Sequence, residues 1–100
     1  MTPNEFQEWV CSKWKSKRGE EFTLRDDFIM TVGLGGETGE VLEILKKNVR
    51  DGKFDKVHLT EELGDVLYYL TMIAARHEIR LSDIIDANVI KLNERYKDRK

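Results

Sequence analysis

The spacing of apolar residues constrains the fold most, because they recur every three or four positions along almost the whole chain. That period places them on one face of an α-helix, and we find no run with the alternation that is typical of a half-buried strand. The hydroxyl side chains of Thr2, Thr23 and Ser82 are suitable N-caps. We therefore predict helices at about residues 3–17, 24–50, 55–78 and 82–96.

Short connections between helices favour antiparallel neighbours, so we expect segments 24–50 and 55–78 to lie side by side. One hundred residues with 40% hydrophobic content suffice for one core, and no linker divides the chain. We predict one all-α domain over residues 1–100, a four-helix bundle. The wide apolar faces suggest that a dimer interface completes its core.

The charge balance excludes some partners. The chain has 17 basic and 19 acidic residues and a net charge of -2, which gives no global field for a polynucleotide. The N-terminus carries Glu5 and Glu8 where a signal peptide is basic, and no apolar run approaches the roughly 20 residues of a membrane span. Cys11 is the single cysteine, as suits a reducing compartment. We expect a cytoplasmic protein that binds neither polynucleotide nor membrane.

Two pairs of acidic residues carry the expected chemistry. Glu37 and Glu40 are three positions apart, as are Glu62 and Asp65, so each pair shares one helical face. Antiparallel packing would bring all four carboxylates together, where they repel one another unless a cation binds. Oxygen ligands suit magnesium, or manganese in its place.

Glycines flank these acidic pairs, although each costs a helix about 1 kcal/mol relative to alanine. Gly36, Gly39 and Gly64 are expected to leave room for neighbouring helices and for a phosphate chain.

Three stretches of the sequence resemble a known superfamily. They are GLGGETGEVLEILKK at 33–47, EELGDVLYYL at 61–70 and ANVIKLNERY at 87–96. The first two are similar to the paired ExxE and ExxD motifs of the MazG-like, all-α nucleotide pyrophosphohydrolases, and the likeness runs from about Phe28 to Tyr96. The resemblance implies hydrolysis of an NTP or dNTP to the monophosphate and pyrophosphate, with the four acidic residues binding magnesium.

The resemblance also implies that Asn88, Lys91 and Arg95 contact the phosphates. Their spacing places them on one helical face, which supports that role independently, although basic residues near a helix C-terminus also complement its dipole. One carboxylate of the cluster should accept the proton of the attacking water. Glu40 is the first choice for this base, with Glu37 beside it.

Other functions remain open at this point. One is the related phosphoribosyl-ATP pyrophosphohydrolase activity, and another is a non-catalytic helical dimer that binds a nucleotide or a protein. Either a homodimer or a homotetramer fits. Buried packing is preferred for Trp9, while the role of Trp14 is open. Four basic residues gather at the end of the second helix and could guide a triphosphate, although a solvated surface is the favoured interpretation: Lys46, Lys47, Arg50 and Lys53.

Overall fold

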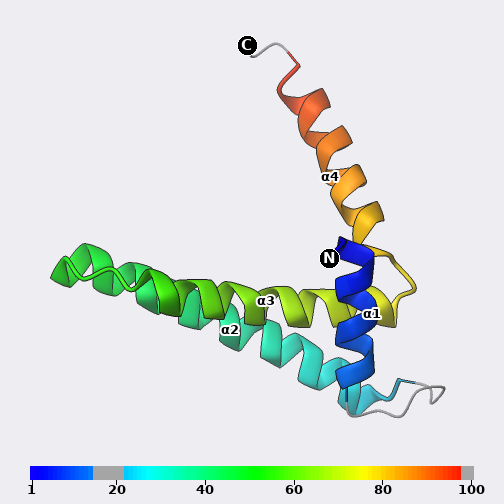
Figure 1. The fold of residues 1–100 in the computed structure, drawn as a ribbon, viewed down its shortest axis with the longest axis horizontal. Coiled ribbons are helices and arrows are strands. Elements are labelled where there is room, and N and C mark those ends of the chain that lie inside the picture. Colours follow the sequence, from blue (N-terminus) through cyan, green and yellow to red (C-terminus); the bar gives the residue numbers. More distant parts are fainter. Residues whose placement is uncertain (15–21, 98–100) are drawn as a thin grey trace.

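The computed structural model describes residues 1–14 and 22–97 (Figure 1). It contains four helices: α1 (Pro3–Lys13), α2 (Leu24–Asp51), α3 (Lys56–Arg76) and α4 (Leu81–Arg95). No strand occurs in the described part of the chain, so the all-α prediction is confirmed. The first helix ends earlier than predicted, since Trp14 already has an extended backbone, and residues 15–17 of the predicted helix fall outside the described residues.

The central pair consists of α2 and α3, and local capping residues determine where these helices begin and end. Thr23 and Asp26 make a reciprocal capping box at the start of α2, with the Asp26 N–H donating to Thr23 Oγ1 at 3.2 Å. Gly52 ends that helix in the left-handed conformation, at φ 67°. Asp55 Oδ1 accepts from the His58 N–H at 2.9 Å and starts α3. A short turn therefore joins α2 to α3.

The helices α2 and α3 pack side by side and antiparallel, as predicted (Figure 1). Arg76 Nε donates to Asp27 Oδ1 at 2.8 Å and ties the end of α3 to the start of α2. The two helices approach closely at Gly33, where an added Cβ would collide with the Tyr69 ring. Gly36, Gly39 and Gly64 instead face open space, so no other helix of this chain uses the room that they leave. That they make room for a phosphate chain stays a prediction.

The helix α1 covers one end of the α2–α3 pair. Val10 is fully buried against Met30 and Met72, and Trp14 packs beside this core with its Nε1 donating to Asp26 Oδ1 at 3.1 Å. The prediction that Trp9 belongs to the core was wrong. The residue is 48% exposed, and its ring stacks on Phe6, with ring centres 6.1 Å apart, outside the buried cluster.

The start of α4 is held by side chains of α1. Ser82 lies inside the helix rather than at its cap, and the side chain of Arg80 at the cap position makes no hydrogen bond to the backbone amides of the first turn. Gln7 Oε1 accepts from the Leu81 N–H at 3.0 Å, and Asn4 Oδ1 accepts from the Ser82 N–H at 3.1 Å. The predicted cap was therefore wrong, and α1 satisfies these amides instead. From there α4 leads away from the α2–α3 pair (Figure 1).

The chain exposes much more surface than a compact monomer of its mass. Its accessible area is 8097 Å², whereas a folded monomer of 11.7 kDa exposes about 5,900 Å². The radius of gyration is 16.3 Å, against about 13 Å for a compact chain of 100 residues. Large apolar side chains such as Ile90, at 70%, account for part of this exposure. None of the described helices has the length and apolar character needed to cross a membrane.

Candidate metal centre

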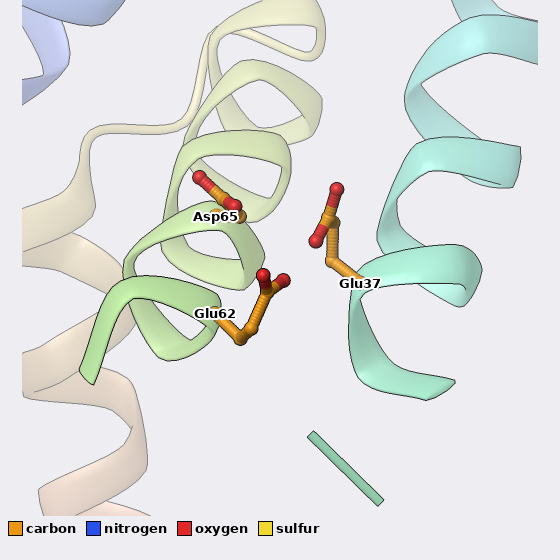
Figure 2. Close-up of side chains that lie close together, drawn as sticks. All are labelled: Glu37, Glu62 and Asp65. Carbon is orange, nitrogen blue, oxygen red and sulfur yellow. The ribbon is translucent and has the colours of Figure 1, made fainter. Parts of the chain in front are cut away.

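Three carboxylates from two helices converge beside the α2–α3 interface. Figure 2 shows Glu37 on α2 pointing toward Glu62 and Asp65 on α3. One oxygen of each lies within 4.8 Å of the others. The three-residue spacing puts Glu62 and Asp65 on the same face of α3, and the antiparallel pairing brings Glu37 opposite them. The structure thus joins residues from both predicted motifs.

Glu62 is largely enclosed, with its side chain 16% exposed. Its Oε1 lies 3.3 Å from Nε2 of His58, one helical turn earlier. Its Oε2 is buried and has no hydrogen-bond partner among the described residues. A buried, unpartnered carboxylate oxygen costs free energy, so this atom calls for a proton or a cation.

The neighbouring carboxylates raise the pKa of Glu37 from its ordinary 4.5 to about 7. The largest cause is hydrogen bonding with Glu62, because a proton on Glu37 supplies a donor to that carboxylate. Burial and repulsion from Glu62, Asp65 and Glu40 act in the same direction. A cation between the helices would remove this repulsion.

Glu40 lies outside the trio and is exposed on α2. It is still close enough for its charge to raise the pKa of Glu37. In this chain Glu40 therefore interacts with the trio through its charge. Its role as a metal ligand stays a prediction.

The predicted phosphate residues Asn88, Lys91 and Arg95 are exposed on α4, which leads away from the α2–α3 pair that carries the carboxylates (Figure 1). On this helix they share a face with Ile84 and Leu92, which are partly buried. One chain therefore does not bring the two predicted groups together. The two cations nevertheless border the apolar face of α4, so a partner packed on that face would lie beside them.

His58 is the site residue that sequence reasoning missed. The signal was its position four residues before Glu62, which places both side chains on one face of α3. Contact of this kind orients a ligand carboxylate.

The donor set fits a hard divalent cation. All three groups are carboxylates, their oxygens converge, and one buried oxygen lacks a partner. Oxygen ligands of this kind suit magnesium or manganese rather than zinc. The fold and site define an all-α protein with a candidate cation centre between antiparallel helices.

The chain belongs to the MazG nucleotide pyrophosphohydrolase domain family, whose model matches residues 29–100. That membership supports nucleotide pyrophosphohydrolase activity in general, which is the activity of a hydrolase.

One curated relative is the Gene 37 protein of Mycobacterium phage L5, which is 37% identical over 75 residues. The match covers 70% of this chain and 65% of the phage protein, just under two thirds of its length. No solved structure matches the chain significantly.

Proposed function

We propose that the protein hydrolyses nucleoside triphosphates, ribo or deoxy, to the monophosphate and pyrophosphate with magnesium, or manganese in its place. The observation that carries this proposal is the convergence of Glu37, Glu62 and Asp65 around a buried oxygen that has no partner in the described structure. Family membership supports the reaction class. The reaction and the lone thiol of Cys11 both fit a cytoplasmic protein with a single domain.

In this proposal Glu37, Glu62 and Asp65 hold the cation. When bound, it neutralises phosphate charge and lowers the pKa of a coordinated water. Glu40 is our choice for the base, because it lies near Glu37 yet outside the trio and can accept a proton. The water oxygen forms a bond to the α-phosphorus as its proton moves to Glu40. The bond from that phosphorus to the bridging oxygen breaks, and its electron pair leaves with pyrophosphate.

We also propose a homodimer, either alone or as half of a tetramer, in which α4 of each subunit covers the α2–α3 pair of the other. Each chain exposes about 2,200 Å² more than a compact monomer of its mass, and burial of that area on each subunit falls within the range of obligate interfaces. Lys91 and Arg95 border the apolar face of α4, and the site on α2 and α3 is acidic, so the two surfaces are complementary in charge. Asn88, Lys91 and Arg95 of the partner would then contact the phosphates.

Subunit complementation tests the shared site. Glu62→Gln and the double variant Lys91→Ala with Arg95→Ala should each be nearly inactive alone. Random mixing should restore about one quarter of wild-type activity, because half of the dimers are mixed and each has one complete site. No recovery from stable mixed dimers would mean that the phosphate residues act within their own subunit.

A hydrolysis panel tests the function itself. Normal and modified ribo- and deoxynucleoside triphosphates, together with phosphoribosyl-ATP, should be incubated with magnesium and the products identified by ³¹P NMR. We expect monophosphate and pyrophosphate from triphosphates. Turnover of phosphoribosyl-ATP alone would reassign the substrate, and nucleotide binding without turnover of any compound would indicate a non-catalytic dimer.

A further inference from the structure

A groove opens at the turn between α2 and α3, beyond the carboxylates. It has a volume of about 610 Å³, within the range of small-molecule sites. Lys47 borders it from α2, Lys53 from the turn and Lys56 from the start of α3. His58 also lines it and contacts Glu62, so the groove begins one helical turn from the candidate metal centre.

The lining of this groove has a net positive charge, because its lysines outnumber its carboxylates. Of its two carboxylates, Asp51 is held by Arg50 through two hydrogen bonds of 2.9 Å, and Asp55 caps α3. None of the three lysines forms an ion pair with any residue that the structure describes. Besides the hydrogen bonds from Arg50, the charge of Lys47 helps to lower the pKa of Asp51, and Lys53 and Lys56 have no such partner among the described residues. Three ammonium groups around one groove favour an anion with several charges.

The opposite direction from the carboxylates has different chemistry. Tyr69 lies one turn beyond Asp65, with its ring centre 5.3 Å from that of Tyr68, and Trp14 packs against Tyr68 at 6.3 Å. The α2–α3 pair is therefore aromatic on one side of the carboxylates and basic on the other. A nucleoside triphosphate has a matching arrangement, with an aromatic base at one end and negatively charged phosphates at the other.

We infer that Lys47, Lys53 and Lys56 form a subsite for the β- and γ-phosphates, the part of the substrate that leaves as pyrophosphate. This inference rests on the proposed function and fixes the direction in which the substrate lies, with its base toward Tyr69. The ammonium groups oppose the negative charge that develops on the leaving group. Lysine suits this position because its point charge binds phosphate in many orientations.

Calorimetric titration with pyrophosphate in the presence of magnesium tests the subsite without requiring turnover. The variant is Lys53→Gln with Lys56→Gln, since both residues are exposed and a folding defect is therefore not expected. The matched control is Lys46→Gln, which removes a lysine that is paired with Glu43 and does not line the groove. We expect the double variant to bind pyrophosphate at least about tenfold more weakly, and the control to bind as wild type does.

Nucleoside monophosphate serves as the second ligand. Its affinity should be unchanged in the double variant, because the monophosphate does not reach the lysines. Unchanged pyrophosphate affinity, or no pyrophosphate binding to the wild type, would overturn the inference. A larger loss for the monophosphate would also overturn it, since the nucleoside would then occupy the groove. Failure of the proposed function is distinguishable, because it appears as absent hydrolysis in the wild type.

Discussion

Glu37 of α2 and Glu62 of α3 face each other across the helix pair, and hydrogen bonding between them is the main reason that the pKa of Glu37 is raised to about 7. Both residues come from motifs that are far apart in the sequence. Because the two carboxylates are close together, their charges repel each other in the folded protein, and binding of either a proton or a cation relieves this repulsion. The stability of the protein and its metal affinity should therefore depend on pH in linked ways.

The metal-free protein should lose stability as the pH rises from 4.5 to about 7. Glu37 holds its proton more tightly when folded than when unfolded, so its contribution is complete at low pH and disappears as the folded carboxyl ionises. Thermal unfolding in EDTA across this range measures the effect. Glu37→Gln should make the melting temperature nearly independent of pH in this range. If the variant shows the same slope as the wild type, groups other than Glu37 cause the pH dependence.

Magnesium should raise the melting temperature of the wild type, and more at pH 8 than at pH 6, because protons compete for Glu37 at the lower pH. Glu62→Gln should weaken magnesium binding by more than about tenfold. It should also stabilise the metal-free protein, since it removes repulsion. Differential scanning calorimetry can compare it with Glu61→Gln, an exposed neighbour outside the trio that should respond as the wild type does.

Glu40→Gln should separate catalysis from metal binding. Since Glu40 lies outside the trio, calorimetry should give a magnesium affinity close to that of the wild type. The kcat should fall by about 10²–10⁴, as expected when a general base is removed. A magnesium affinity reduced as strongly as in Glu37→Gln would instead make Glu40 a ligand, as the sequence motif predicts.

Gly33→Ala should destabilise the fold by about 1–3 kcal/mol, because the new methyl group meets the Tyr69 ring and must push the helices apart. Gly35→Ala is the matched control. Its position faces open space in this chain, so the better helix propensity of alanine should stabilise α2 by up to about 1 kcal/mol. Urea unfolding compares the two. Equal free energies of unfolding for the two variants would show that the Tyr69 ring moves aside without loss of stability.

Helical period and capping residues were sufficient to predict four helices and the pairing of α2 with α3, because those signals are local. They could not predict that Gln7 and Asn4 supply the cap of α4, since that contact joins residues more than 70 positions apart. The motif spacing predicted where Glu37, Glu62 and Asp65 point. It could not predict that Glu40 is exposed, because two residues three positions apart share a face but not an equal distance from the neighbouring helix.

Pyrophosphate release by the wild type and by Asp65→Asn, each with saturating magnesium and with EDTA, tests the central claim most directly. We predict steady release by the wild type with magnesium, none with EDTA, and a loss of at least about 100-fold in the variant, because one of its three converging ligands is neutralised. Full activity of Asp65→Asn, or equal release by the wild type in EDTA, would contradict a metal-dependent centre at these carboxylates.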